Sequence, residues 1–345
     1  MTGMGTSIDR HLTNSEKNEC TAACVDVLIA ARNRADTIER AVESALAQPE
    51  VHTVIVVDDG SEDDTASRAS RCDLTGKRLI VERLSHNIGP AAARNIAIEI
   101  STNPWLAILD GDDFFLPARI GHLLSHSDHW DFIADDVLQL GEDKCGCEPP
   151  SVRGFTELSR PQSINLEQFV RGNITRRGVL RRELGFIKPL IRSSFLRRHA
   201  LRYDEELRLG EDYALYARAL ALGARFALVP AVGYVASIRP DSLSAQHGRE
   251  DLERFRDTDC ELLAMATLSK PERRALTAHY TSADCRVQWL RVIEGFKARS
   301  VKEFSRPFFR SVHVSRYLVR QLASELVERS KRIFRQRVRR AGSMA

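Results

Sequence analysis

Short apolar runs alternate with segments of helical periodicity from Val25 to about Asp136. Each run has the length of a strand and is rich in valine, isoleucine and leucine, which are common in buried strands. The five runs cover residues 25–31, 51–57, 78–84, 105–109 and 131–138. Strands that alternate with helices are typical of an α/β fold with a mostly parallel, Rossmann-like sheet flanked by helices, and the pattern predicts this fold class.

The segments between the runs carry helix signals. After the first run, apolar residues recur at helical spacing, and Asp36 precedes them where it can cap a helix. These apolar residues are Ile38, Ala41, Val42, Ala45 and Leu46. After the second run, Ser61 and Asp64 have the spacing of a capping box before a helix at 66–70. After the third run, Pro90 opens an alanine-rich helix at its first turn.

The pattern changes after the last run. Proline, glycine and charged residues prevail over residues 141–160, which indicates a loop or a lid. A helix-rich part extends from Ile164 to Leu222, and the chain beyond Leu252 has helical character. Its end, at 302–340, alternates aromatic and aliphatic residues with arginine and lysine.

The length and composition allow one substantial core. With 345 residues, of which 43% are apolar, the chain can build an α/β core together with a second lobe or an extended tail. The net charge of +4 hides an asymmetry, because arginine and lysine gather at the end of the chain. Neither a GxGxxG motif nor a P-loop motif follows the strands, which argues against a dinucleotide cofactor and against P-loop chemistry.

The cysteines and the first residues bear on the compartment. The seven cysteines are an odd number without a CxxC pair, so neither a disulfide framework nor a zinc site is indicated, and a reducing cytoplasm fits. The first twenty residues are polar, and no apolar stretch has the length of a signal sequence or a transmembrane helix. We expect a cytoplasmic protein.

Polar residues follow three of the predicted strands, in the loops 32–34, 58–61 and 110–113. In an open α/β sheet, ligands bind beyond the carboxyl ends of the strands. In the second loop, aspartate and serine can cap the following helix, while Asp59 can accept hydrogen bonds from a base or a ribose hydroxyl. The two roles are compatible, and we expect the three loops to converge on one binding site.

The third loop holds three carboxylates in four residues. Asp110, Asp112 and Asp113 would repel one another unless a cation or a hydrogen-bond donor lies nearby. Mg²⁺ and Mn²⁺ prefer carboxylate oxygens and are often bound by one or two of them together with substrate phosphates. A solvated acidic turn is the alternative. We expect a divalent cation here, with Asp112 as its direct ligand.

Four motifs, in this order, resemble those of the family 2 glycosyltransferases, which have the GT-A fold. They are VDVLIAARN at 25–33, VVDDGS at 56–61, NIGPAAARN at 87–95 and LDGDD at 109–113. Further on, GEDY at 210–213 resembles the acidic motif on the acceptor side of that family. The resemblance implies a loose N-terminus at 1–23, a GT-A catalytic domain at 24–250 with a nucleotide-sugar half at 24–136 and an acceptor half at 160–250, and a helical, basic extension at 251–345.

The resemblance also implies a role for each motif residue. It assigns nucleotide-sugar binding to Ala30, Arg32, Asp59, Arg94 and Asp110. Among these residues, Arg94 would lie near the base and the diphosphate, and Asp110 would face the ribose. Asp112, together with Asp113, would bind Mg²⁺ or Mn²⁺. Arg32 departs from the tyrosine that many relatives carry at its position.

An inverting transfer is implied as well. Asp212 would take the proton from the acceptor hydroxyl, and Glu211 would place it or bind the acceptor. An acidic first turn of an ordinary helix is the alternative. By this resemblance the enzyme moves a hexose, glucose from UDP-glucose in a beta linkage, to a polyprenyl-diphosphate-linked saccharide. The chain is similar to glucosyltransferases of succinoglycan and other bacterial exopolysaccharides.

Two other functions stay open on the residues alone. A phosphohydrolase of the haloacid dehalogenase type also has a D-x-D motif at a strand end and would use Asp110 as its nucleophile. The order of elements argues against it, because that nucleophile follows the first strand, whereas Asp110 follows the fourth predicted strand. A non-catalytic scaffold that binds a nucleotide sugar would not need Glu211 and Asp212.

The basic segment 302–340 has two interpretations. It can pack on the catalytic domain as a solvated helix, or it can lie on anionic lipid at the inner face of the plasma membrane. Nucleic-acid binding would use the same arginines, but no motif of a nucleic-acid-binding fold accompanies them. We expect no nucleic acid as a partner.

Overall fold

The computed structural model describes residues 25–140, 160–174, 184–237 and 248–342, with side-chain environments up to Lys331. The predicted loose segment at 1–23 and nearly all of the predicted loop or lid at 141–160 lie outside the described residues. Within those ranges, no helix is both long enough and apolar enough to cross a membrane.

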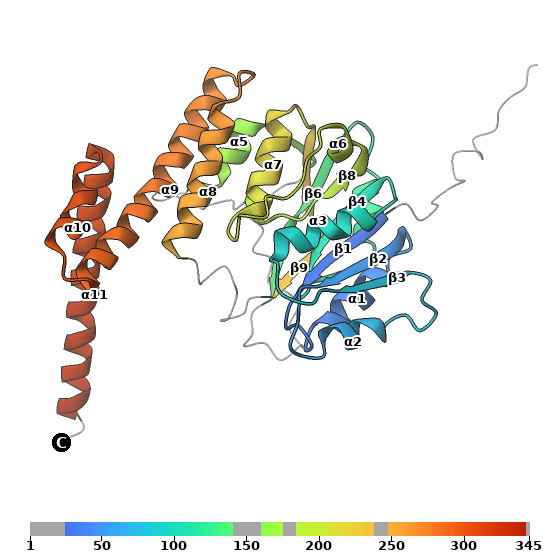
Figure 1. Cartoon of the computed structure of the whole chain (residues 1–345), viewed down its shortest axis with the longest axis horizontal. Helices are drawn as coiled ribbons and strands as arrows, with labels where there is room; N and C mark the ends of the chain where they lie inside the picture. Colours follow the sequence, from blue (N-terminus) through green and yellow to red (C-terminus); the bar gives the residue numbers. More distant parts are fainter. Residues whose placement is uncertain (1–24, 141–159, 175–183, 238–247, 343–345) are drawn as a thin grey trace, which may run out of the picture.

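The described strands form one nine-stranded sheet with the order β3-β2-β1-β4-β8-β6-β9-β5, and β7 pairs with β9 (Figure 1). The strands are β1 (Val25–Ala31), β2 (Val51–Asp58), β3 (Leu79–Arg83), β4 (Trp105–Asp110), β5 (Phe114–Phe115), β6 (Phe132–Leu140), β7 (Gln162–Ile164), β8 (Leu190–Arg192) and β9 (Phe226–Ser237). The pairs β3-β2, β2-β1 and β1-β4 are parallel, as is β6-β9, whereas β8 is antiparallel to β4 and β6. The predicted α/β class with a mostly parallel central sheet is confirmed.

Helices flank this sheet and continue beyond it. They are α1 (Ile38–Leu46), α2 (Thr65–Ser70), α3 (Pro90–Ile100), α4 (Arg119–Leu124), α5 (Leu166–Gly172), α6 (Ser193–Arg198), α7 (Glu211–Ala221), α8 (Arg249–Leu263), α9 (Lys270–Lys297), α10 (Val301–Ser305) and α11 (Val312–Gly342), with 3-10 turns η2 (Leu184–Phe186) and η4 (Arg306–Phe309). In Figure 1, α3 crosses the near face of the sheet, and α8 to α11 extend away from it on one side.

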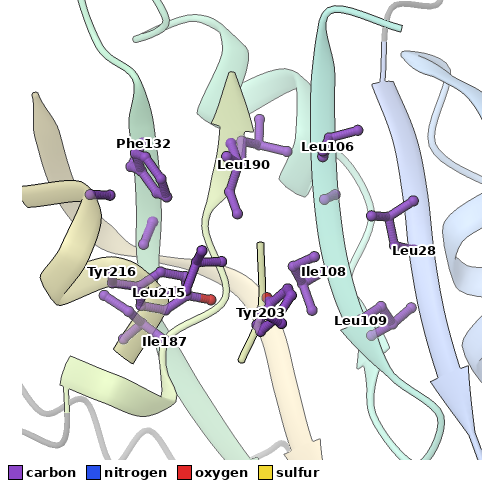
Figure 2. Close-up of a cluster of buried hydrophobic side chains, with 14 of the residues drawn as sticks. Leu28, Leu106, Ile108, Leu109, Phe132, Ile187, Leu190, Tyr203, Leu215 and Tyr216 are labelled. Carbon is purple, nitrogen blue, oxygen red and sulfur yellow. The ribbon is translucent and has the colours of Figure 1, made fainter. Parts of the chain in front are cut away.

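The central strands are mostly apolar because both faces of the sheet are covered. All but one residue of β1 and of β4 are buried. Figure 2 shows Leu28 of β1 and Ile108 of β4 in one apolar layer with Phe132 of β6, Leu190 of β8 and Tyr216 of α7. Complete burial of one such side chain contributes about 1.5–3 kcal/mol. This layer fixes α7 against the strands whose ends carry the site.

The first predicted helix is present, but its cap differs from the prediction. Four residues of the predicted apolar stripe, Ile38, Ala41, Val42 and Ala45, are buried in α1. Thr37, not Asp36, stands at the N-cap position, and no side-chain hydrogen bond caps the helix. The predicted cap at Asp36 is wrong because the chain already turns at Arg34, whose carbonyl accepts the N–H groups of Thr37 and Ile38.

The predicted capping box at the second helix is also wrong. The backbone N–H of Ser61 donates to Asp58 Oδ1 over 3.1 Å, and its hydroxyl donates to the same oxygen. The helix begins only at Thr65, with Asp64 at the N-cap position and no side-chain cap. Ser61 therefore shapes the loop after β2. The third prediction is confirmed, since Pro90 stands in the first turn of α3.

All five predicted strands are present, and four others were not predicted. The part predicted to be helix-rich contains α5, α6 and α7, but also β8, which has only three residues. β9 carries Pro230 and Gly233, two residues that disfavour a strand in a sequence pattern. Its partner β6 accommodates this irregular stretch with a register shift between Asp135 and Val137.

The C-terminal helices confirm the helical character predicted beyond Leu252. α8 lies alongside α9, and the start of α11 packs on the far end of α9 (Figure 1). Val314 and Leu318 of α11 are buried there together with Cys285 and Val292 of α9. From Val319 to Lys331, α11 is mostly exposed.

Candidate functional site

The loops after β1, β2 and β4 lie at one edge of the sheet. Because β1 is parallel to both neighbours, Ala31 pairs with Asp58, and Ala30 pairs with Asp110. The backbone N–H of Asp59 donates to the Ala31 carbonyl over 2.8 Å, which ties the first two loops together. The sheet thus brings three motifs that are far apart in the sequence into one site.

Asp59 organises the backbone around the first part of this site. It is buried, and its carboxylate oxygens accept hydrogen bonds from the N–H groups of Ile88 at 2.6 Å and Gly89 at 3.0 Å. A carboxylate has about four lone-pair sites, so Asp59 can still accept a hydrogen bond from a ligand. The aspartate therefore joins the end of β2 to the start of α3.

A pocket of about 510 Å³ opens beside Asp59, and Arg32, Leu84 and Asn87 are among its lining residues. Its wall depends on Gly60, which has a φ of +65° and lies against the backbone of the 86–87 segment. A Cβ at this position would come within 2.6 Å of the His86 carbonyl carbon, so only glycine fits. Ala30 and Asp59 are not among the residues that line it.

Five charged residues, three buried and two half-buried, form a cluster at the end of β4, which we call the Arg94–Lys188 cluster. Its members are Arg94, Asp110, Lys188, Glu211 and Asp212. Arg94 donates to Asp110 Oδ1 at 2.7 Å and to Glu211 Oε1 at 2.8 Å. Lys188 Nζ lies 2.9 Å from Asp110 Oδ2 and 2.6 Å from Asp212 Oδ2. Three carboxylates from two distant motifs therefore share two cations.

The pKa shifts of Asp110, Lys188 and Arg94 all favour the charged form of the side chain. Burial alone would raise the pKa of Asp110, but the positive charges of Lys188 and Arg94 hold it well below its usual range. Burial would lower the pKa of Lys188, but the carboxylates of Asp110 and Asp212 raise it above its usual value. The Arg94 pKa is raised for the same reason, by Asp212, Asp110 and Glu211 against the effect of burial.

Asp112 and Asp113 have different surroundings. Asp112 is half-buried at the sheet edge, where its Oδ2 lies 3.3 Å from Arg34 Nε. Asp113 is buried, and its oxygens accept from the Tyr234 hydroxyl at 2.7 Å and from the Ser237 N–H at 2.9 Å. Burial, with the charges of Asp110 and Asp112, raises the pKa of Asp113 to about 8.

This donor set fits a cation that is completed by its substrate. Among the described residues, no group of three or more histidine, cysteine or acidic side chains could hold a metal by itself. Mg²⁺ commonly takes only one or two protein carboxylates and completes its shell with phosphates and water. Both oxygens of Asp113 already have protein partners, and Asp112 lies next to it, half-buried against Arg34.

A buried ion pair behind the cluster was not predicted from the sequence. Arg119 and Asp135 are fully buried, with Arg119 Nη2 2.6 Å from Asp135 Oδ1. Arg119 also donates to the Lys188 carbonyl at 2.7 Å, while Asp135 Oδ2 accepts the N–H of Tyr234 at 3.1 Å. The pair therefore holds the backbone of two residues that contact the aspartates of the site.

Some sequence signals for these missed residues were present. Asp135 lies inside a run that was predicted to be a strand, where a carboxylate needs a partner. Lys188 is a lone cation in the stretch Phe186 to Leu190, but a single lysine has no motif that would assign it to a site.

Comparisons with known proteins agree with this geometry. The family model described as Glycosyl transferase family 2 matches residues 26–153. Succinoglycan biosynthesis protein ExoU of Rhizobium meliloti (strain 1021) is 50% identical over 255 residues, which are 74% of this chain and 74% of that protein. Succinoglycan biosynthesis protein ExoO of the same organism is 40% identical over 224 residues, 64% of this chain and 62% of that protein.

A solved structure supports the fold. S. aureus TarS 1-349 in complex with UDP-GlcNAc has a TM-score of 0.58 and 17% sequence identity, and the match covers 81% of this chain and 89% of that chain. At this identity the likeness concerns the fold alone. It confirms the sheet and helix arrangement that was expected from the motifs.

Proposed function

Because this chain belongs to glycosyltransferase family 2, we propose that it moves a hexose from a nucleotide sugar to a saccharide with inversion at the anomeric carbon. Membership of the family makes the chain a glycosyltransferase. The phosphohydrolase alternative is not favoured, since both oxygens of Asp110, its nucleophile, lie in ion pairs with Arg94 and Lys188. A scaffold without catalysis would have no use for Asp212 in the same cluster.

The observation that carries the proposal is the junction of donor-side and acceptor-side motifs. Asp110, at the end of β4, and Asp212, in the first turn of α7, contact the same Lys188 ammonium. A single displacement needs the acceptor hydroxyl and the donor's anomeric carbon side by side. A base and a donor-binding carboxylate that share one counter-ion meet this requirement.

On the donor side, we propose that the nucleotide occupies the pocket beside Asp59. Arg32 lines it, and Asp59 directly precedes Gly60 of its wall, with its N–H bonded to the carbonyl of Ala31, next to Ala30. Asp110 then faces the ribose, and the Arg94 guanidinium attracts the diphosphate. UDP-glucose is the proposed donor.

Asp112 is our proposed ligand for Mg²⁺ or Mn²⁺, and Asp113 supports the same loop from behind. A bound divalent cation would neutralise charge on the departing diphosphate. Asp212 accepts the proton of the acceptor hydroxyl while that oxygen attacks the anomeric carbon. Glu211, held at 2.8 Å by Arg94, fixes the start of α7 and so the position of this base.

We propose succinoglycan biosynthesis, or that of a similar exopolysaccharide, as the pathway. The support is the 50% identity to ExoU over most of both chains. In such a pathway the acceptor is a polyprenyl-diphosphate-linked saccharide, and the linkage formed is beta. A lipid-linked acceptor fits an enzyme that works on the inner face of the plasma membrane from the cytoplasmic side.

The C-terminal helix supports such a peripheral contact. Val319 and Leu326 are 58% and 65% exposed, and they are seven positions apart, so that both lie on one face of α11. Arginine and lysine are frequent around and beyond them, as anionic lipid would require. We propose that the exposed part of the segment 302–340 faces the membrane.

One assay tests the proposed function. Purified protein is incubated with UDP-, GDP- and TDP-sugars, with Mn²⁺ or Mg²⁺, in the presence and absence of a chelator, and nucleotide release is measured with and without a lipid-linked acceptor. We expect acceptor-stimulated UDP release from UDP-glucose that the chelator abolishes. Metal-independent release of inorganic phosphate would overturn the proposal.

A further inference from the structure

A buried lysine connects the two sides of the site. Lys188 lies between η2 and β8, its side chain is 6% exposed, and its ammonium bridges Asp110 at 2.9 Å and Asp212 at 2.6 Å. We propose that Lys188 is a positioning residue that couples occupation of the donor site at Asp110 to the placement of the base Asp212. The inference rests on the proposed function of these two aspartates.

The backbone of Lys188 is fixed, so that only its side chain can respond. Its carbonyl accepts a hydrogen bond from Arg119, which is itself fully buried and paired with Asp135. Pro189 follows directly and restricts the chain further. The ammonium can therefore move toward one aspartate only by moving away from the other.

The charges make the two contacts interdependent. A buried ammonium that loses one carboxylate partner must be compensated by another, since an unpaired buried charge is strongly unfavourable. Lys188 stays protonated, because its two carboxylates raise its pKa. A ligand that binds Asp110, or brings a diphosphate near it, changes the electrostatic attraction on the Lys188 ammonium. The contact between Lys188 and Asp212 changes as a result.

Arg94 does not duplicate this link. Its short contacts go to Asp110 at 2.7 Å and Glu211 at 2.8 Å, while Asp212 Oδ1 lies 3.9 Å from its Nη1. The closest cation to the proposed base is therefore Lys188. A planar guanidinium with two fixed partners stabilises the cluster, whereas the flexible lysine can shift between its partners.

A double-mutant cycle tests the coupling. The dissociation constant of UDP-glucose with Mn²⁺ is measured by calorimetry for wild type, Asp212→Asn, Lys188→Met and the double variant. We expect Asp212→Asn to change the dissociation constant about three- to tenfold when Lys188 is present, as neighbouring residues do, and to leave it unchanged in the Lys188→Met background. Equal factors in both backgrounds would overturn the proposal.

Two further measurements keep the test decisive. Lys188→Arg keeps the charge and should recover part of the kcat that Lys188→Met loses, with a smaller effect on the donor KM.

Where Lys188→Met does not fold, the cycle of Asp110→Asn with Asp212→Asn replaces it, and additive effects on UDP-glucose affinity would refute the coupling. If wild type binds no nucleotide sugar, the proposed function fails instead. Melting temperatures of the same variants then still report whether Asp110 and Asp212 interact through Lys188.

Discussion

The two carboxylate oxygens of Asp212 are held unequally. Its side chain is 8% exposed, Lys188 contacts one oxygen at 2.6 Å, and the Tyr216 hydroxyl lies 3.5 Å from the other. The short contact orients the carboxylate, and the long one leaves the second oxygen only loosely held. In the proposed mechanism, Oδ1 is therefore the oxygen that accepts the proton of the acceptor hydroxyl.

Substitution Asp212→Asn removes the proposed proton acceptor and keeps the size of the side chain. We expect transfer to fall by about 10²- to 10⁴-fold, because general-base catalysis contributes about that much. Nucleotide-sugar affinity should stay within about tenfold of wild type, since the change is on the acceptor side. Initial rates and calorimetry check both expectations. Asp257→Asn, an exposed aspartate of α8, is the matched control, and full activity of Asp212→Asn would require another base.

Substitution of Asp112 tests the proposed metal site. We expect Asp112→Asn to raise the Mn²⁺ concentration for half-maximal activity by at least about tenfold, as the loss of a metal-site residue does. Rates over a metal titration measure this. Asp128→Asn, an exposed aspartate away from the site, should keep the wild-type titration curve. If Asp112→Asn kept it as well, the ion would bind elsewhere.

Asp113 makes folding stability depend on pH. Its pKa is about 8 in the folded protein, because of burial and the charges of Asp110 and Asp112. In an unfolded chain the pKa of aspartate is about 3.9. The folded state binds the proton of Asp113 more tightly than the unfolded state does. Protonation of Asp113 therefore stabilises the fold fully below about pH 4, and this stabilisation is lost as pH rises through about 8. Chemical unfolding in chelator should show this loss in wild type and a flatter curve in Asp113→Asn. Parallel curves would contradict the assignment.

The sequence identified the residues that belong to motifs and missed those that depend on folding. Asp110, Arg94 and Asp212 were singled out, and the structure brings them into one cluster. Lys188 reaches that cluster only because β8 enters the sheet antiparallel between β4 and β6. No local pattern encodes such an insertion, so a lone lysine before a three-residue strand could not be assigned.

At the scale of elements, the strands that the sequence predicts are those that form separate, uninterrupted apolar runs. β1, β2 and β4 are mostly buried, and their sequences are mostly apolar. β9 is just as central, but Pro230 and Gly233 interrupt it. Its neighbour β6 adjusts with a register shift. The tertiary context therefore outweighs the local preference of these two residues.

A buried polar chain links three helices. The Tyr213 hydroxyl of α7 donates to Asp259 Oδ1 of α8 at 2.8 Å, and His279 Nδ1 of α9 lies 2.6 Å from Asp259 Oδ2. The Tyr213 and His279 rings stack with centroids 4.5 Å apart. The helical extension is thus bonded to the residue that follows the proposed base.

Removal of the shared carboxylate tests this link. Asp259→Ala leaves the buried tyrosine hydroxyl and imidazole without their partner, and each unsatisfied group costs about 1–3 kcal/mol. We expect a loss of unfolding free energy of that order in a denaturant titration. Asp257→Ala, exposed on the same helix, should change stability by less than about 0.5 kcal/mol. Equal stability of the two variants would mean that water replaces the carboxylate.

At the scale of the whole molecule, α11 has two unlike parts. Its start is held on α9 through Val314 and Leu318, which are buried. Its continuation runs away from the rest of the chain in Figure 1, and Leu326 and Val327 are exposed there. A truncation near the start of the helix would disturb a packed core, whereas one after Gln321 removes only the exposed part.

Flotation with liposomes decides what the exposed part does. We expect the full chain to float with vesicles that contain phosphatidylglycerol and not with phosphatidylcholine alone, because the helix combines apolar and basic side chains. The chain ending at Gln321 should stay in the soluble fraction, as should the full-length variant Leu326→Glu with Val327→Glu. Both should keep wild-type rates on a water-soluble acceptor, since they leave the packing of Val314 and Leu318 intact. Equal soluble fractions for all three proteins would leave α11 as a solvated helix and remove the membrane from the mechanism.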